Sequence, residues 1–539
     1  MRPRGGKRIR AVARGSLCFV GLASVSVAAT TGMAVGMASA SAVAIALSKT
    51  SGPPTSTITV TGTGFTPSKR ISVTFAGSTA TTTTSDTSGN FKAAVTVPKS
   101  TVPGSYSVSA SDNVHASSAT FMVRTNWVTF GFSAAASGNN PYENVLNTAT
   151  VKSLSLFGTG TGLSANSVGA SPSPPVVYDG EVFVTDYYHH LFAFKQTCLV
   201  TAKVCSPLWS ASAGIAQDQI SVANGVVYVP DASFTGIDAY STSGSLLWKG
   251  TTPFSGGGGG GPVVANKVVY FPDGRSLYAF STNSLSANCS TSSGLRTCTP
   301  LWSSKAASAS ISQGVTISGG LAYVSADKLY AFNATANAST CTTSAGATTC
   351  SPVWTGTSYS AQADGQPVVA AGEVYVDQGN GILYQYPTTA GGANCSGPTT
   401  ARTCTPHWKT GISFSYGAPA IANGMIFANA NSFLAALSAS TGALVWTTPQ
   451  FATGQWGTPV AANGVVYTGD GNNSLGAYSE GKTAQCATAI GPFGNVPTCH
   501  PLWTATQKGA AVATPVVADG AVYVSGALSS GGGISVYHA

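Results

Sequence analysis

Cysteine is the residue whose spacing in this chain most clearly indicates chemistry. Ten of the eleven cysteines form five local pairs, and each pair ends in a Cys-x-Pro-x-Trp phrase such as Cys298-Thr-Pro-Leu-Trp302. The pairs are Cys198/Cys205, Cys289/Cys298, Cys341/Cys350, Cys395/Cys404 and Cys486/Cys499. An even number of cysteines, always paired locally, predicts disulfides in an exported chain. Metal binding is the rival interpretation, and it is disfavoured because no pair has Cys-x2-Cys spacing and no histidine pattern accompanies the pairs.

Histidines and aspartates are the other candidate ligands. His189-His190 could bind a ligand or a metal, although adjacent residues of a strand point to opposite sides and share one ion only where the chain bends. Aspartates recur after the second strand of several repeats, at Asp186, Asp231, Asp273, Asp377 and Asp470. A ring of carboxylates could collect cations or sugars, but local turn hydrogen bonds are the favoured interpretation. An exposed Trp456 would suit a carbohydrate platform, whereas packing between repeats is the favoured role of the tryptophans.

The N-terminal segment indicates export. Six basic residues lie in the first 14 positions and precede the charge-free stretch 15–48, which contains Ala38-Ser39-Ala40. This pattern predicts a signal peptide over residues 1–44, with an uncleaved membrane anchor as the alternative. No second apolar segment of spanning length follows, so we expect a secreted mature chain without a membrane span. Beyond residue 40, 19 basic residues face 17 acidic ones, which gives no electrostatic case for nucleic-acid binding.

A longer repeat surrounds the cysteines and predicts the fold. Its clearest copy runs Pro367-Val-Val-Ala-Ala-Gly-Glu-Val-Tyr-Val376, then Leu383-Tyr-Gln-Tyr386, then Trp408. Eight copies begin near Pro175, Ile220, Pro262, Gly314, Pro367, Pro419, Pro459 and Pro515. Asn-Gly or Asp-Gly between the first two Val-rich runs of several copies predicts a type I′ hairpin. Four short antiparallel strands, repeated every 40 to 55 residues or so, are a propeller blade.

The cysteine pairs predict how the blade loops are held, and the two ends of the repeat array predict how the ring closes. Two repeats have a short turn before the tryptophan strand, at Ser243-Gly244 and Thr441-Gly442, whereas in five others the two cysteines bracket a longer loop. We expect each disulfide to staple that loop, a stabilisation of about 2.5 to 3 kcal/mol. The eighth repeat lacks its tryptophan strand, and Val151–Gly158, with Phe157 in the tryptophan place, is predicted to replace it. The prediction is an all-β, eight-bladed propeller.

The unit P-V-V-x-x-G-x-V-Y-V, L-Y-A-F, T-G-x-L-W resembles the repeat of the pyrroloquinoline-quinone (PQQ) type β-propellers over residues 127–539. Trp127–Phe132 and Asn140–Glu143 look like the lead-in of that family. The resemblance implies an eight-bladed PQQ-like propeller, and it is a weak signal of function because the same repeat serves dehydrogenases and non-catalytic scaffolds. The family's enzymes hold PQQ with a disulfide between adjacent cysteines and with a metal bound by Glu, Asn and Asp.

The catalytic features of those enzymes are not recognisable in this chain. It has no adjacent cysteines, its glutamates are Glu143, Glu181, Glu373 and Glu480, and Cys499-His500 lacks the first cysteine of a haem c motif. We therefore carry over no catalytic residue, and we predict no metal and no cofactor. PQQ and Ca2+ enter only under the alternative of a quinoprotein alcohol or sugar dehydrogenase.

Residues 45–126 form a separate module by their pattern. Thr57–Phe65, Ile71–Phe75, Ala93–Val97 and Tyr106–Ala110 alternate apolar and polar residues between turn signals, which predicts a β-sandwich. The module resembles bacterial immunoglobulin-like domains of the IPT/TIG kind, which usually act as spacers or adhesive units. The sequence as a whole predicts a secreted, non-enzymatic scaffold that binds protein or polysaccharide at the cell exterior.

Overall fold

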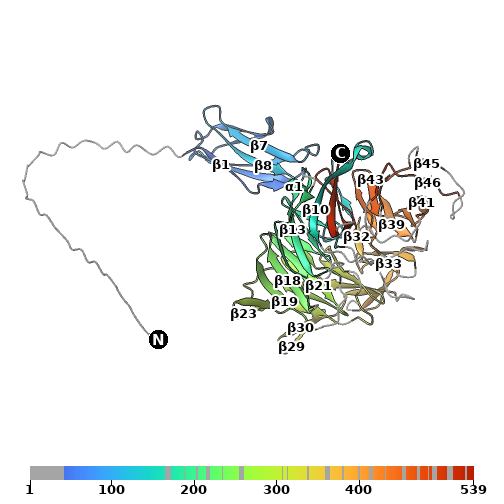
Figure 1. Cartoon of the computed structure of the whole chain (residues 1–539). Helices are drawn as coiled ribbons and strands as arrows, with labels where there is room; N and C mark the ends of the chain where they lie inside the picture. The colour runs from blue at the N-terminus through green and yellow to red at the C-terminus, as the bar shows by residue number, and fades with distance from the viewer. Residues whose placement is uncertain are drawn as a thin grey trace, which may run out of the picture. The chain divides into compact units, whose positions relative to one another are not determined.

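The computed structural model describes residues 42–539 apart from short internal gaps. The gaps are residues 164–171, 187, 202–203, 214–218, 234, 254–259, 306, 312–313, 337–338, 358–364, 379–380, 399–400, 412–416, 431, 452–456, 470–473, 483–484, 488–494, 507–513 and 529–530. Nearly all of the regular structure is strand (Figure 1). None of the helices in this described part is long and apolar enough to cross a membrane. The predicted signal peptide falls almost entirely outside the described residues.

The first folded region is a β-sandwich. One sheet has the order β1-β3-β6 and the other β2-β8-β7-β4-β5. These strands are β1 (Ala44–Leu47), β2 (Ser51–Gly52), β3 (Thr57–Thr63), β4 (Arg70–Phe75), β5 (Ser78–Thr84), β6 (Phe91–Thr96), β7 (Gly104–Ser111) and β8 (Ala116–Val123). Alternate residues of β3, β4 and β6, such as Ile58, Val73 and Val95, enter one core, as the alternating pattern predicts.

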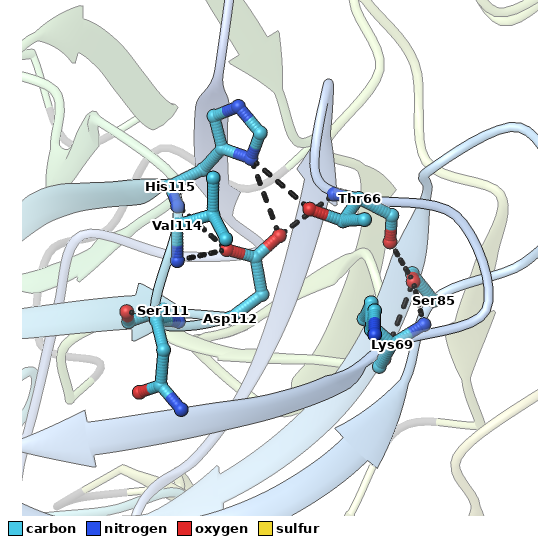
Figure 2. Close-up of polar contacts among 8 residues, drawn as sticks. Thr66, Lys69, Ser85, Ser111, Asp112, Val114 and His115 are labelled. Carbon is cyan, nitrogen blue, oxygen red and sulfur yellow. Dashed lines mark hydrogen bonds and ion pairs between the residues drawn. The ribbon is translucent and has the colours of Figure 1, made fainter.

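A buried carboxylate joins two loops of this sandwich (Figure 2). Asp112, after β7, accepts backbone hydrogen bonds from Thr66, Val114 and His115 at 2.6 to 2.8 Å. Burial would raise the pKa of Asp112, but these hydrogen bonds outweigh it and hold the pKa well below its usual range. The Asp112 side chain therefore fixes the connection between β3 and β4 against the connection between β7 and β8.

The remaining chain forms eight four-stranded antiparallel blades. In chain order they are blade 1, β11 (Val176–Tyr178), β12 (Glu181–Thr185), β13 (His190–Lys195), β15 (Trp209–Ser212); blade 2, β16 (Ser221–Ala223), β17 (Val226–Pro230), β18 (Gly236–Ser241), β19 (Leu246–Thr251); blade 3, β20 (Val263–Ala265), β21 (Val268–Asp273), β22 (Ser276–Ser281), β25 (Trp302–Ser304); and blade 4, β26 (Val315–Ser318), β27 (Leu321–Ser325), β28 (Leu329–Asn333), β31 (Trp354–Gly356). Then follow blade 5, β32 (Val368–Ala370), β33 (Glu373–Gln378), β34 (Ile382–Pro387), β37 (Trp408–Gly411); blade 6, β38 (Ala420–Ala422), β39 (Met425–Ala430), β40 (Phe433–Ser438), β41 (Leu444–Thr447); blade 7, β42 (Val460–Ala462), β43 (Val465–Gly469), β44 (Ser474–Ser479), β47 (Trp503–Thr506); and blade 8, β48 (Val516–Ala518), β49 (Ala521–Leu528), β50 (Gly531–His538), β10 (Ser155–Leu163).

The ring closes as predicted. β10 pairs antiparallel with β50, so a strand from the start of the propeller completes the last blade (Figure 1). One hydrophobic cluster joins blades 7, 8 and 1. Two details of the prediction were wrong: Thr150–Ser153 is a 3-10 helix (η1), and Gly158, not Phe157, lies opposite Val536 where other blades place tryptophan. Phe157 sits in a bulge and is 43% exposed.

Hairpin turns between the first two strands have the predicted chemistry. Asp179-Gly180, Asn224-Gly225, Asn423-Gly424, Asn463-Gly464 and Asp519-Gly520 all have positive φ at both residues. A type I′ turn requires this conformation, which Asn, Asp and Gly adopt with the smallest conformational strain. We call the end of the propeller that carries these turns the turn face. The opposite end, which carries the connections between second and third strands, is the loop face.

The lead-in to the first blade runs through the propeller axis. Backbone N–H groups of six innermost strands donate to carbonyls of residues 127–138 at 2.7 to 3.0 Å; the donors are Val177, Val222, Ile317, Val369, Ile421 and Ala461. The side chain of Asn140, in β9 (Asn139–Asn140), donates to the Val517 carbonyl of blade 8. The axial segment has a glycine where it passes closest to blade 6. A Cβ on Gly138 would lie 2.9 Å from the Cβ of Ala420, so a larger residue would not fit there. The axis is thus filled by the chain itself.

The disulfides occupy the outer edges of blades. The structure joins the same five cysteine pairs that the spacing indicates. Four pairs close short ribbons: β23 (Cys289–Ser292) with β24 (Leu295–Cys298), β29 (Cys341–Ser344) with β30 (Ala347–Cys350), β35 (Cys395–Ser396) with β36 (Arg402–Cys404), and β45 (Cys486–Ala487) with β46 (Thr498–Cys499). The fifth links α1 (Gln196–Leu199) to β14 (Val204–Cys205).

Each ribbon lies on the blade before its own. β24, which belongs to blade 3 in sequence, pairs in parallel with the tryptophan strand β19 of blade 2, and β30, β36 and β46 do the same to blades 3, 4 and 6. The tryptophans of these four blades, Trp248, Trp302, Trp354 and Trp446, are at most 2% exposed. Trp209, Trp408 and Trp503, on blades without a ribbon, are only half-buried. A ribbon therefore completes the burial of the preceding blade's tryptophan.

The ribbon over Trp302 gives a test of this arrangement. Replacing Cys341 and Cys350 together by Ala should lower the stability by about 2.5 kcal/mol, because the unfolded chain gains loop entropy. Hydrogen exchange at Ser303 and Ser304, which pair with β30, should become faster. The matched control replaces Thr343 and Thr348 by Ala on the exposed part of the same ribbon. Unchanged melting and exchange in the cysteine variant would contradict this role.

Candidate binding site at the propeller axis

The ends of the second strands bring polar side chains to the axis at the loop face. Each second strand begins at a turn-face hairpin and runs to the opposite end of the propeller, so its last residues lie at the loop face. Five of these residues are polar and at most 5% exposed: Thr185, Ser325, Asp377, Asn429 and Ser525. Each lies opposite the residue of the third strand that occupies the leucine place of the L-Y-A-F pattern, as Asp377 lies opposite Leu383. These equivalent positions form a broken ring of buried hydroxyl, carboxylate and amide groups.

The register separates Asp377 from the other aspartates of the predicted ring. Asp186 and Asp231 follow their second strands, and Asp273 is one residue beyond the position of Asp377 because Pro272 faces Leu277. A shift of one residue turns a side chain to the other face of a sheet. The five aspartates therefore do not form one ring, and Asp470 lies outside the described residues. The sequence did not indicate this because aspartate follows proline in two repeats and valine in another.

Asp377 borders a small pocket between blades 5, 6 and 7. Its polar lining residues are Asp377, Asn429 and Thr458, and its apolar lining includes Leu383 and Pro419. The Asn429 amide donates to the Gly457 carbonyl and accepts from the Thr468 hydroxyl. These contacts hold the amide in one orientation beside the carboxylate. The hollow has room for about one water molecule, so it can take a single small polar group and does not enclose a ligand.

Asp186 and the two histidines form a local turn. The buried Asp186 carboxylate accepts backbone hydrogen bonds from Tyr188 and His190 at 3.0 and 2.9 Å, and His190 Nδ1 lies 3.2 Å away. His189 has φ of 65°, so the chain bends between the two imidazoles. Asp231 likewise accepts from the backbone and hydroxyl of Thr235. Both aspartates make the turn contacts that the sequence favoured.

A buried ion pair was missed by the sequence analysis. Asp238 in β18 is 2% exposed, and both of its carboxylate oxygens lie 2.8 Å from Nζ of Lys249 in β19. Burial raises the pKa of Asp238, and Lys249 counteracts that rise. The available signal was a charged residue at the second position of the L-x-A-F strand, with lysine directly after the tryptophan. Burial also raises the pKa of Asp273, whose carboxylate accepts from Thr252.

The glutamates lie at the turn face and make structural contacts. Glu143 accepts from the backbone of Val145 and Leu146 and from Gly520 in the turn of blade 8. Glu480 accepts from Asn423. Glu373 pairs with His407 at 3.2 Å, and Glu181 lies opposite Tyr178 in its hairpin.

The residues present do not fit the PQQ site of the quinoprotein enzymes. Within the described ranges, no three His, Cys, Asp or Glu side chains are grouped in a way that could hold a metal ion. The cysteines are joined within blade-edge hairpins, away from the axis, and Cys499 of the Cys-His pair is one of them. Trp456, which the sequence also singled out, lies outside the described residues.

Comparison with known proteins identifies the kind of propeller. Residues 147–401 match a PQQ-type repeat family described as outer membrane protein assembly factor BamB. Among solved structures, a quinohemoprotein alcohol dehydrogenase from Comamonas testosteroni is 13% identical, with 77% of this chain and 80% of that chain covered and a TM-score of 0.54. A europium-containing methanol dehydrogenase is 12% identical, with 77% and 98% covered and a TM-score of 0.52.

A third structure, a quinohemoprotein alcohol dehydrogenase from Pseudomonas putida HK5, is 12% identical, with 77% and 80% covered and a TM-score of 0.53. No curated protein sequence matches the chain. At such low identities the structural likeness shows the fold alone. The repeat match over residues 147–401 and the architecture together show the fold of a PQQ-like β-propeller.

The ion pair at the loop face predicts a pH-dependent mutational effect. Lys249→Met should lower the stability by about 2 kcal/mol at neutral pH, because Asp238 loses its cation while the lysine end of the pair is partly solvated. A carboxyl whose pKa is raised by folding destabilises the folded state once pH exceeds the unfolded pKa, and protonation relieves this. The loss of melting temperature should therefore be smaller at pH 5 than at pH 7.5.

Lys409→Met is the matched control for this prediction. Lys409 also follows the tryptophan of its blade, but it lies opposite Tyr384 instead of a buried aspartate. Its replacement should change the melting temperature little at either pH. Equal effects of the two substitutions, or a larger effect of Lys249→Met at pH 5, would contradict the role given to Asp238.

Proposed function

We propose that this PQQ-like propeller is a secreted, non-enzymatic scaffold that binds protein or polysaccharide through its loop face. One observation carries the proposal: the residues that could have served catalysis make structural contacts instead. The axis is filled by the lead-in, the cysteines close blade-edge hairpins, and the glutamates hold turn-face contacts. Side chains at the loop face, such as the 53% exposed Tyr188, stay accessible. The small hollow beside Asp377 adds polar groups at this face.

The proposed location rests on the cysteines and the N-terminal segment. Five disulfides suit an oxidising compartment outside the cytoplasm. The basic and then apolar N-terminus suits a signal peptide. The two-sheet module at residues 44–123 fits an immunoglobulin-like domain of the IPT/TIG kind, and we assign it the role of a spacer or adhesive unit.

A protein is the first class of partner to test. The family matched by residues 147–401 is described as an assembly factor, which works on other proteins. Polysaccharide is the second class, because exposed aromatic rings and a carboxylate are the groups that contact sugars. In either case the loop face would hold the contacts.

The alternative function is a quinoprotein alcohol or sugar dehydrogenase. Two of the similar structures are quinohemoprotein alcohol dehydrogenases, which favours testing it. Titrating the full-length secreted chain with PQQ and Ca2+ should give no saturable change of cofactor absorbance or melting temperature. Dye reduction with alcohols and aldoses should stay at the level without protein. Saturable binding with turnover would establish the dehydrogenase instead.

Loop-face binding has its own test. The chain should co-sediment with cell-surface polysaccharide or bind proteins of the producing cell's exterior, and Tyr188→Ala should weaken this binding several-fold. Phe157→Ala is the control, because Phe157 is a comparably exposed aromatic residue on the outer edge of blade 8. Equal binding by both variants and the parent chain would show that the contact lies elsewhere.

A further inference from the structure

Four consecutive blades share an unusual pattern at the axis. Just before the first strand lie Gln219 in blade 2, Gly261 in blade 3, Gly314 in blade 4 and Gln366 in blade 5. In blades 2, 4 and 5 this residue is three positions before the axial contact. Gln219 is 8% exposed and Gln366 is 2% exposed. Blades 2 and 5 therefore each place a buried glutamine at this position, and the two blades between them place a glycine there.

The two glycines make room for the glutamine side chains. A Cβ on Gly261 would lie 2.4 Å from the Cβ of Gln219, so only glycine allows this side chain to pass. A Cβ on Gly314 would lie 2.7 Å from Oε1 of Gln366 and 3.4 Å from Oε1 of Gln219. Both amide oxygens thus lie close to the same point above Gly314.

Several polar groups around these oxygens are already paired with other partners. The Gln366 amide donates to the Val315 carbonyl at 2.8 Å and to the Thr316 hydroxyl at 3.2 Å, which fixes its oxygen toward Gly314. The Thr316 hydroxyl donates to the Pro367 carbonyl. Near Gln219, the Ser221 hydroxyl lies 2.6 Å from the Thr129 hydroxyl of the lead-in. Oε1 of Gln219 and Oε1 of Gln366 are both buried, and neither has a hydrogen-bond partner among the described residues.

Two buried acceptors without partners near one point suggest that a ligand lies between them. An unsatisfied buried acceptor destabilises a fold by about 1 to 3 kcal/mol, so native structures rarely leave two together. Both Oε1 atoms can only accept hydrogen bonds or coordinate a cation, so their ligand is a cation or a hydrogen-bond donor. They are also neutral, whereas Ca2+ sites in proteins usually include carboxylates. Neutral carbonyl oxygens are the ligands by which proteins hold alkali-metal ions.

We propose that Gln219 and Gln366 hold an alkali-metal cation at the propeller axis, above the lead-in. The two amide oxygens supply protein ligands, and water supplies the remaining coordination. The cation would join blades 2 and 5 across the two glycine-bearing blades. The argument for this cation requires neither a loop-face partner nor PQQ.

The test compares cations at equal ionic strength. The melting temperature of the full-length secreted chain should be higher in KCl or NaCl than in tetramethylammonium chloride, with a saturable rise of about 2 °C or more. Gln219→Met and Gln366→Met should each remove this difference. A crystal soaked in RbCl should show an anomalous peak within bonding distance of both amide oxygens.

Gln385→Met is the matched control. Gln385 is a buried glutamine in blade 5 whose side-chain NH2 donates to the Tyr375 hydroxyl and to the Ala439 carbonyl. This variant should melt lower in every salt and keep the difference between cations. Identical melting of the parent chain in all three salts would overturn the proposal and leave water as the occupant. Variants that melt as high as the parent while the cation difference persists would also overturn it.

Discussion

The propeller depends on hydrogen bonding at its axis. Innermost strands present N–H groups to the centre of the ring, where a buried donor without a partner would be costly. Residues 127–138 accept these hydrogen bonds from six blades, and the Asn140 side chain reaches a seventh. The same segment precedes β10, which pairs with β50 and closes blade 8. One stretch of chain therefore fills the axis and leads directly into the closing strand, so axial packing and ring closure are coupled.

The outer edge follows a second rule, which links each blade to the next. In blades 2 to 7 the connection between the third and fourth strands is either a disulfide ribbon or a short turn, and it lies against the preceding blade's tryptophan. Ribbons pair with the tryptophan strand and bury the ring completely, as over Trp354. The short turns place glycine against the ring instead: a Cβ on Gly244 or Gly442 would lie 2.7 or 2.6 Å from Trp209 or Trp408. Neighbouring blades are thus held together at the perimeter as well as at the axis.

These two rules account for most of the residues that could have served catalysis. Cysteines belong to the perimeter, glutamates to the turn face, and Asp186 and Asp231 to local turns. What remains near the axis at the loop face is a set of buried polar groups, with Asp377 at a pocket and Gln219 and Gln366 above the lead-in. Side chains of this kind can recognise a ligand or an ion without changing its covalent structure. This distribution is the physical basis for proposing a binding protein.

The sequence by itself determined the blade count, the type I′ turns, the cysteine pairs and the closing strand. Each of these follows from local spacing: turn residues need positive φ, and alternation of apolar residues sets the strands. Tertiary structure alone decided where non-local groups meet. Asp377 is one residue out of register with Asp273, and the partnership of Asp238 with Lys249 depends on strand pairing. The convergence of Gln219 and Gln366 over Gly314 depends on the angle between blades, because residues nearly 150 positions apart become neighbours only when the ring forms.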